Sequence, residues 1–491
     1  MWMLTAILVC GFMMMTACSD DDDNRNGNTP DNAVIQAGTY VWGSTIYAMG
    51  ADGAARLAEV YEKTGIKHVV LLVKGESGTI GYFKNSLSNA PKSRTDRDIL
   101  AETVSAMHAK GIKVYAWLVV GVDEAYQEAH PEQSSFHFRR GFCKESIDIS
   151  QKDYHQYMAK VIKEIDQNYD VDGFALDYVR YQGPYYGWSD SDYELLTTPV
   201  ALGGYGLTLD EYNELVTLLA KQYGYPVAPN AEGRLVYNAN GVVPEAEEEA
   251  LYNAFYEGNK AAVAFGRMRE KLTDDICEYL VSQTSKPSYV ATMSECTTDP
   301  HIATVAYGLT FNQAYTFDVV CPMLYSADYS ADSKWVTQNI SYLKTLGYKT
   351  IIPSLQAYGD ATTTTLTADI RATMDEGCQG YLLFNTGSYD IASPVATDGG
   401  TIELTYVRGT ESPSGNIAIA ISGVTPTAVT MSGLLAGTSY KIDGQKIMFK
   451  ADALKRMADY GIVTIKTSGS GKISVNVTSD KQIVYNAPMK D

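Results

Sequence analysis

One short stretch of the chain combines residue types that hydrolytic chemistry needs. Residues 171–181 read VDGFALDYVRY, an apolar strand that ends in a carboxylate. Asp177 shares one face of this strand with the small residues Gly173 and Ala175, because side chains alternate along a strand. A carboxylate in that position costs free energy unless it is paired, hydrogen-bonded or used in chemistry. Arg180 is close enough to pair with Asp177 or to hold a substrate, so a purely structural Asp–Arg pair is the alternative interpretation.

A second carboxylate is required if this chemistry is glycoside hydrolysis, which uses one ionised carboxylate and one that can donate a proton. Asp177 is the predicted first carboxylate. Glu295 follows the apolar run 289–293 and is the predicted acid/base, with a solvated loop glutamate as the alternative. Three further carboxylates also follow apolar runs and are more typical of substrate hydrogen-bonders or surface charges: Glu76, Asp123 and Asp328.

A carbohydrate site also needs flat apolar rings and polar groups at its rim. The loop Tyr185–Trp188 is the best stacking candidate because it lies outside the predicted strands, although Tyr and Trp also bury large areas in cores. The predicted substrate-binding residues lie at strand ends and in adjacent loops: Lys74, Glu76, Trp117, Arg180, Tyr185, Trp188, Tyr325, Gln356 and Asn385.

These residues converge only if the elements that carry them form one sheet. From Gly38 onward a unit recurs, consisting of an amphipathic helix, a glycine that can end it, and a short apolar strand. Continuous apolar strands are typical of parallel sheets buried on both faces, and their alternation with helices implies βαβ units. The predicted strands cover residues 39–47, 68–73, 114–119, 173–178, 288–293, 319–324, 350–355 and 380–384.

Eight such strands predict an α/β fold, a (β/α)8 TIM barrel over residues 38–394, with its site at the C-terminal ends of the strands. The rival is a doubly wound open sheet, which would usually carry a glycine-rich phosphate loop after its first strand. The excess length lies mostly in residues 181–252, a predicted insertion after strand four in which Thr208 and Glu211 indicate a capping box. Residues 401–491 predict a small β-rich, sandwich-like domain. It contains few aromatic residues, which favours buttressing of the barrel over glycan binding.

The strand-four stretch resembles the glycosyl-hydrolase-like family 10 barrels, whose corresponding strand reads roughly YDVDGIHLDYIRY. Residues 169–181 of this chain read YDVDGFALDYVRY. Residues 114–118 and 321–325 are similar to the "VHAWL" and "sPMxY" strands of that family. The resemblance covers roughly residues 38–390 and implies a glycoside-hydrolase barrel with Asp177 in its site. Lys74 stands where the family often has Arg, which keeps the charge but changes bidentate recognition.

The N-terminus predicts export. The apolar run 4–15 is too short to span a bilayer and is typical of a signal peptide over residues 1–18. Residues 15–18 resemble a lipobox in which Cys18 becomes acylated, with an ordinary cleaved signal as the alternative. Residues 19–37 predict a flexible tether, and its acidic start resembles the surface-export signal of some Gram-negative lipoproteins. The predicted location is the outer membrane, exposed at the cell surface or else facing the periplasm.

The amino-acid composition of the chain limits the classes of ligand that we expect it to bind. A net charge of −19 argues against nucleic acid, whose phosphates need clustered Lys and Arg, and against a polyanionic glycan as the default substrate. The five cysteines after Cys18 show no CxxC spacing and are mostly predicted to be small buried residues. The histidines are scattered, so we predict no metal and no cofactor.

The sequence therefore predicts a lipoprotein glycoside hydrolase that acts on a poly- or oligosaccharide through Asp177 and Glu295. The main alternative is a non-catalytic glycan-binding lipoprotein on a hydrolase-like barrel. A different hydrolase or lyase on the same fold is the third hypothesis, but the sequence contains no Gly-x-Ser-x-Gly elbow to support an esterase or peptidase.

Overall fold

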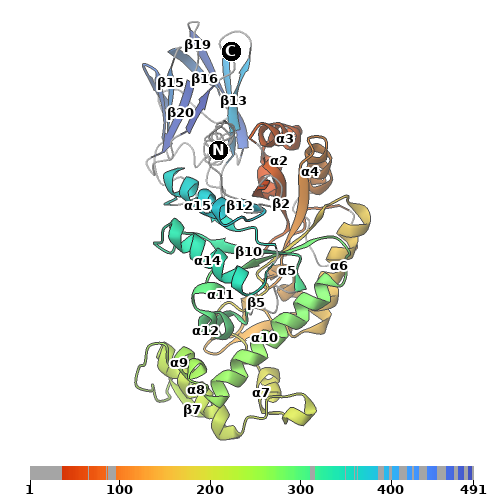
Figure 1. Cartoon of the computed structure of the whole chain (residues 1–491), viewed down its shortest axis with the longest axis vertical. Helices are drawn as coiled ribbons and strands as arrows, with labels where there is room; N and C mark the ends of the chain where they lie inside the picture. The colour runs from red at the N-terminus through yellow and green to blue at the C-terminus, as the bar shows by residue number, and fades with distance from the viewer. Residues whose placement is uncertain are drawn as a thin grey trace, which may run out of the picture.

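A closed barrel of parallel strands forms the centre of the molecule (Figure 1). The computed structural model describes residues 36–488 except 65, 84–85, 87–95, 310–315, 349, 359, 362, 385–391, 398–400, 408–416, 423–424, 431–439, 451–459, 469–473 and 480–484. The strands close in the order β1-β12-β11-β10-β9-β6-β3-β2. Their bounds are β1 (Gln36–Trp42), β2 (Ile66–Lys74), β3 (Lys113–Val119), β6 (Gly173–Asp177), β9 (Ser288–Thr292), β10 (Val319–Leu324), β11 (Ser354–Gln356) and β12 (Gly380–Phe384).

Helices cover the outside of this barrel, which confirms the predicted (β/α)8 fold. They are α2 (Gly43–Ala48), α3 (Gly53–Thr64), α4 (Ile99–His108), α5 (Glu124–Ala129), α6 (Lys152–Asn168), α10 (Lys260–Val281), α14 (Ser333–Thr345) and α15 (Thr363–Asp375). The largest hydrophobic cluster lies between strands and helices and includes Val69, Leu118, Leu176 and Ile162. Burial of this apolar surface is the main driving force for the fold.

Two predicted strands differ from the structure by more than two residues at one or both ends. The first was expected to reach residue 47, but β1 ends at Trp42 and α2 begins at Gly43. The seventh was expected at 350–355, whereas β11 covers only Ser354–Gln356. Pro353 precedes β11 and has no backbone N–H to donate, which explains its late start.

The barrel interior is filled by a second set of side chains that includes Tyr40, Tyr115, Trp117, Ala175 and Tyr289. Gly173 allows close packing in this layer: a Cβ there would lie 2.4 Å from the carbonyl oxygen of Pro287 and 2.8 Å from the Tyr115 ring. Asp177, four residues later on β6, points into the same interior at the C-terminal end of the strand.

The insertion after β6 builds a core of its own. It contains α7 (Asp190–Thr197), a short helix η2 (Val200–Leu202), α8 (Leu209–Tyr223), a hairpin of β7 (Val227–Pro229) and β8 (Leu235–Tyr237), and α9 (Ala250–Tyr256), and it leads into α10. Leu215, Leu219 and Phe265 pack together there. The predicted capping box of α8 is present, with the Thr208 side chain accepting from Glu211 N–H and the Glu211 side chain accepting from Thr208 N–H.

Other loops at the C-terminal ends of the strands also carry structure. After β3 come the turn η1 (Pro131–Gln133) and a hairpin of β4 (Ser134–His137) and β5 (Gly141–Ile147). After β9 come α11 (Glu295–Thr298), α12 (Pro300–Ile302) and a π-helical turn η3 (Ala303–Tyr307). π-Turns are frequent at functional sites.

The C-terminal part is β-rich, as predicted. One sheet has the order β13-β14-β19-β16, from β13 (Ala392–Thr397), β14 (Thr401–Val407), β16 (Thr425–Thr430) and β19 (Tyr460–Ser468). The other has the order β17-β18-β15-β20-β21, from β15 (Ile417–Ser422), β17 (Tyr440–Asp443), β18 (Lys446–Phe449), β20 (Ser474–Ser479) and β21 (Tyr485–Pro488). Figure 1 places these sheets at the opposite end of the molecule from the insertion.

The described residues include no helix long and apolar enough to cross a bilayer. Cys18, the predicted signal peptide and almost all of the predicted tether lie outside the described residues.

Candidate active site

Asp177 is the last residue of β6, and its carboxylate faces the inside of the barrel mouth with only 5% of the residue exposed. The indole N–H of Trp117 donates to Oδ2 over 3.2 Å. The backbone N–H of Tyr178 donates to Oδ1 over 2.7 Å. The guanidinium of Arg180 lies 3.7 Å from Oδ1. Both carboxylate oxygens therefore face donors.

Two opposing effects set the charge of Asp177. Burial raises the pKa of its carboxyl above the ordinary range, while Arg180, the Tyr178 N–H and the Trp117 indole lower it. The negative charge of Glu76 adds a smaller upward shift. Because all three close partners are donors, they favour the ionised carboxylate, which accepts hydrogen bonds but cannot donate one.

The residue after Asp177 has an unusual backbone conformation. Tyr178 has a φ of 56°, which is uncommon for a residue with a side chain. Its carbonyl accepts a 2.8 Å hydrogen bond from the N–H of Gly121, where a Cβ would lie 2.2 Å from that carbonyl oxygen. The Arg180 guanidinium stacks 4.1 Å above the Tyr178 ring. Burial raises the pKa of Tyr178 to about 12, with Glu76 also raising it. This strained turn keeps Arg180 beside Asp177.

Glu295 opens α11, directly after β9, and is half-buried. Its Oε1 accepts a 2.9 Å hydrogen bond from the Tyr329 hydroxyl, and its Oε2 accepts a 3.3 Å bond from the Ser294 hydroxyl. Burial, together with the charge of Glu295, raises the pKa of Tyr307 to about 12, while Arg180 lowers it. Arg180 therefore influences Asp177 directly and also Tyr307, on which the charge of Glu295 acts as well.

Aromatic rings gather at the same end of the barrel. Tyr325 stacks on Phe384 with ring centres 5.3 Å apart and meets Tyr358 edge-on at 5.7 Å. Trp42 meets Trp117 edge-on at 5.4 Å and Phe384 at 5.6 Å. Tyr325 and Trp42 are half-buried at the level of the whole residue.

Gln356 forms hydrogen bonds with the loop that carries Asp328. Its side chain, 1% exposed at the residue level, donates to Asp328 Oδ1 over 2.7 Å and accepts from the Asp328 N–H over 3.1 Å. The Tyr358 hydroxyl donates to Asp328 Oδ2 over 2.5 Å. The side-chain amide of Gln356 is therefore engaged within the protein, and Asp328 with Tyr358 is the more accessible pair. Asn385 lies outside the described residues.

Lys74 does not reach the barrel mouth. Its ammonium group lies 2.9 Å from Asp123 Oδ2, with neither side chain exposed, and it donates to the Val119 carbonyl over 3.0 Å. The register of β2 shifts between Leu72 and Lys74, so that Lys74 pairs with Leu118 instead of continuing the face of Leu72 and Trp117. This irregularity turns Lys74 toward the helix layer. The predicted substrate contact is therefore replaced by a buried ion pair.

Trp188 is also placed differently from the prediction of an open stacking platform. It is 6% exposed, its indole N–H donates to the Pro184 carbonyl over 2.8 Å, and its ring packs on Phe265 at 4.9 Å. The insertion has its own core, and Trp188 belongs to it. Tyr185, by contrast, is half-buried and meets His137 at 4.9 Å and Tyr223 of the insertion at 5.3 Å.

Arg269 of α10 joins the loops that follow β6 and β9. It is fully buried and donates to the carbonyls of Tyr186 (2.6 Å), Gly183 (2.9 Å) and Ala306 (2.6 Å). Burial lowers the pKa of Arg269 to about 10, so it keeps its charge at neutral pH. It thereby fixes the segments that carry Tyr185 and Tyr307 relative to each other.

Sequence reasoning gave no role to Tyr307, Tyr329 or Tyr223, which lie around Glu295 and Tyr185. Tyr307 sits in an irregular turn and Tyr223 ends a helix of the insertion, so neither position carries a sequence signal. Among the described residues, no three His, Cys, Asp or Glu side chains are grouped to hold a metal ion. Cys143, Cys277, Cys296, Cys321 and Cys378 are all buried and free, as expected for small core residues.

Comparisons with known proteins agree with this geometry at the level of the fold. Residues 39–196 match a family model described as "Putative glycosyl hydrolase domain". An S-layer-related protein from Niallia circulans is 23% identical over 171 residues, which are 28% of this chain and 11% of that protein. This chain thus spans only a small part of its relative.

One solved structure has a similar fold at low sequence identity, and a second is less similar. The PgaB (BpsB) glycoside hydrolase domain from Bordetella bronchiseptica has a TM-score of 0.51 at 14% identity, over 72% of this chain and 94% of that one. The catalytic domain of β-amylase from Paenibacillus polymyxa has a TM-score of 0.47 at 10% identity, over 71% and 92% of the two chains. The chain therefore folds as a (β/α)8 barrel, and its residues 39–196 are similar to a putative glycosyl hydrolase domain.

Proposed function

We propose that the protein is a glycoside hydrolase that cleaves a poly- or oligosaccharide at the C-terminal face of its barrel. The observation that carries this proposal is Asp177, a buried carboxylate at the end of β6 whose oxygens face three donors. Such a preorganised acceptor suits stabilisation of the positive charge that develops on the sugar in the transition state.

Glu295 is the proposed acid/base. Its oxygens accept hydrogen bonds from two hydroxyls, which can rotate and also serve as acceptors when the carboxyl is protonated. Its partial exposure allows exchange of its proton with solvent, which a group that alternates between acid and base requires. The rings of the half-buried residues Trp42, Tyr325 and Tyr185 offer apolar faces for sugar rings, and Arg180 offers hydrogen-bond donors.

The proposed setting is a lipoprotein of the outer membrane, exposed at the cell surface or facing the periplasm. It rests on the signal-like run before Cys18 and on the tether that follows. Two or more acyl chains, each buried CH2 contributing about 0.8 kcal/mol, would hold the protein stably on the bilayer. Globomycin sensitivity of the precursor, with loss of lipidation in Cys18→Ala, tests this setting.

The experiment that tests the activity compares three soluble proteins that begin at Asn24: the unmodified chain, Asp177→Asn, and Asp170→Asn. Asp170 lies just before the opposite end of the same strand with its side chain 90% exposed, so its substitution is a matched control. Each protein is incubated with a broad oligosaccharide panel, and released sugars are separated by chromatography. We expect cleavage by the unmodified and Asp170→Asn proteins and not by Asp177→Asn. Full activity of Asp177→Asn would refute the proposal, and binding without cleavage by all three would favour a glycan-binding lipoprotein.

A further inference from the structure

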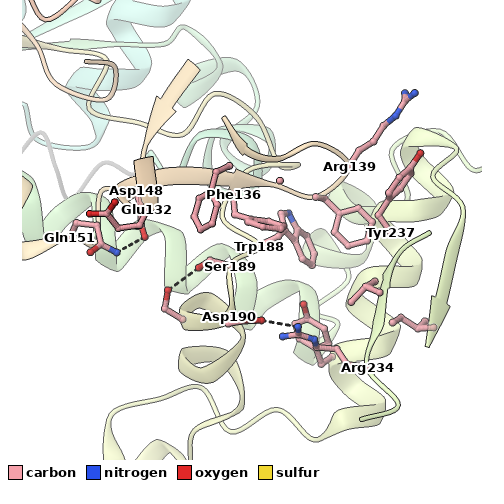
Figure 2. Close-up of a pocket in the computed structure, with 17 residues that line it drawn as sticks. Glu132, Phe136, Arg139, Asp148, Gln151, Trp188, Ser189, Asp190, Arg234 and Tyr237 are labelled. Carbon is pink, nitrogen blue, oxygen red and sulfur yellow. Dashed lines mark hydrogen bonds and ion pairs between the residues drawn. The ribbon is translucent and has the colours of Figure 1, made fainter. Parts of the chain in front are cut away.

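A cavity lies between the β4–β5 hairpin and the insertion (Figure 2). Its volume is about 520 Å³, within the range of small-molecule sites. Neither Asp177 nor Glu295 lines it. Its walls include Phe136 and Phe138 from the hairpin, Trp188 and Tyr212 from the insertion, and Tyr237 from β8.

Residues 136–138, which line this cavity in part, pair through their backbone with the loop 185–188. The Phe138 N–H donates to the Tyr185 carbonyl over 2.8 Å, and the Trp188 N–H donates to the Phe136 carbonyl over 3.2 Å. Side chains alternate along such a strand. His137 therefore contacts Tyr185 on one face, while Phe136 and Phe138 line the cavity on the other. The cavity is thus a separate site and not an extension of the catalytic centre.

Aromatic side chains form the middle and rim of the cavity. Phe136 and Trp188 occupy its centre in Figure 2, with Tyr237 toward one end. Phe142 lines the cavity with 55% of its surface exposed and meets Phe136 edge-on at 5.3 Å. An exposed phenylalanine at a cavity rim costs solvation free energy that a flat apolar ligand face would recover.

Planar polar side chains lie at the two ends. Asp148, Glu132 and Gln151 lie at one end, and the Arg139 side chain extends outward from the rim at the other end (Figure 2). The guanidinium of Arg139 is exposed and makes no hydrogen bond or ion pair with any described residue. Arg234 is fixed by a 2.7 Å contact with Asp190 and by the Tyr193 ring 4.6 Å away. Carboxylates, amides and guanidinium groups can bond hydroxyl groups as donors or acceptors.

We propose that this cavity binds a neutral saccharide segment, as a second carbohydrate site distinct from the barrel mouth. Apolar ring faces combined with planar polar groups match a sugar, which has one apolar face and a rim of hydroxyls. Three carboxylates (Glu132, Asp148 and Asp190) face two arginines (Arg139 and Arg234), so an anionic sugar gains no net attraction. The proposal goes beyond the catalytic one, because binding here does not require turnover at Asp177.

Binding is tested in Asp177→Asn protein, which cannot deplete the ligand by cleavage at Asp177. Isothermal titration is carried out with cellohexaose, chitohexaose, maltohexaose and mannohexaose, and with an oligogalacturonate as the anionic probe. Tyr237→Ala and Arg139→Ala are added separately, and Tyr256→Ala is the matched control. Tyr256 is 70% exposed on α9 and does not line the cavity. Arg139→Ala removes an exposed side chain without a partner among the described residues, so its folding should be unaffected.

We expect at least one neutral hexasaccharide to bind, and Tyr237→Ala and Arg139→Ala each to weaken that binding by roughly tenfold while Tyr256→Ala does not. Equal affinities in all four proteins, binding only of the oligogalacturonate, or no binding of any probe would overturn the proposal. Because catalysis by the unmodified chain is measured separately, failure of this site and failure of the catalytic proposal are distinguishable.

Discussion

Trp117 and Asp177 lie on neighbouring strands, and the indole N–H of Trp117 donates to Asp177 Oδ2 over 3.2 Å. In the register of β3 and β6, Asp177 pairs with Val119, so the Trp117 side chain reaches along its own strand to make this contact. The same ring packs edge-on against Tyr40 at 5.0 Å and Trp42 at 5.4 Å, which fixes its orientation. Trp117 therefore acts as a positioning residue for the carboxylate.

Trp117→Phe should keep most of this packing and remove the donor. A hydrogen bond to a charged group contributes about 1.5–3 kcal/mol, so we expect kcat/KM to fall roughly ten- to a hundredfold. Loss of a donor to the ionised form also raises the pKa of Asp177, so the acidic limb of the kcat/KM profile should move to higher pH. An unchanged acidic limb would show that Trp117 does not affect the ionisation of Asp177.

Glu295→Gln tests the proposed acid/base. A glutamine cannot deliver a proton to the leaving group, so kcat should fall by roughly 10²–10⁴-fold on natural glycosides. The fall should be much smaller on aryl glycosides whose leaving groups need little protonation. Glu257→Gln, at an exposed glutamate just after α9, is the control. Equal losses on both substrate types would contradict an acid role.

Lys74→Met tests the buried ion pair. Removing the ammonium leaves Asp123 charged in a site with no exposed side-chain surface, so unfolding free energy should fall by roughly 3–5 kcal/mol. Adding Asp123→Asn should restore part of it, because no uncompensated charge remains while the Asp123 Oδ1 contact with Tyr126 N–H can be kept. Urea unfolding of the single and the double variant measures both changes in unfolding free energy. Unchanged stability combined with a raised KM would instead indicate that Lys74 binds the substrate.

Asp369 should make stability depend on pH. It lies on α15, accepts a 2.6 Å hydrogen bond from the Ser326 hydroxyl, and burial raises its pKa to about 6. An unfolded Asp titrates near pH ~3.9. Between pH ~3.9 and about 6, the folded protein therefore keeps a proton that the unfolded chain has released. The contribution of this group to stability is complete below pH ~3.9 and is lost as the pH rises through about 6.

Asp369→Asn should abolish this component. Urea midpoints measured from about pH 4 to about pH 8 should show the difference between the two proteins shrinking or reversing as pH rises. Asp375→Asn, at an exposed position of the same helix, is the control. A difference that stays constant across this range would refute the shift.

Strand parity explains which site residues were predictable. Asp177 was placed correctly because β6 is regular, so alternation from Gly173 and Ala175 gives its face directly. The same counting along β2 puts Lys74 with Val70 and Leu72 in the barrel interior, but the irregularity before Lys74 reverses its direction. One extra residue in a strand flips every side chain that follows it, and nothing in the residue types at 72–74 signals that shift.

The burial of Trp188 was not predictable for a different reason. Its position outside the barrel strands suggested an exposed loop, whereas residues far along the chain, such as Phe265, cover it. A burial partner about 80 residues away is set by tertiary packing and not by local pattern. The barrel and the insertion were predictable because helix caps and apolar runs are local signals.

Arg269 has a consequence for how the chain assembles. The three carbonyls that it bonds belong to the segments before and after the insertion helices, so this contact forms only when both ends of a loop of more than a hundred residues have met. Arg269 lies on α10, a barrel helix that follows the insertion, so the barrel keeps both the buried cation and its three carbonyl acceptors when α7 to α9 are exchanged. An exchanged insertion must therefore leave Gly183, Tyr186 and Ala306 in place around Arg269.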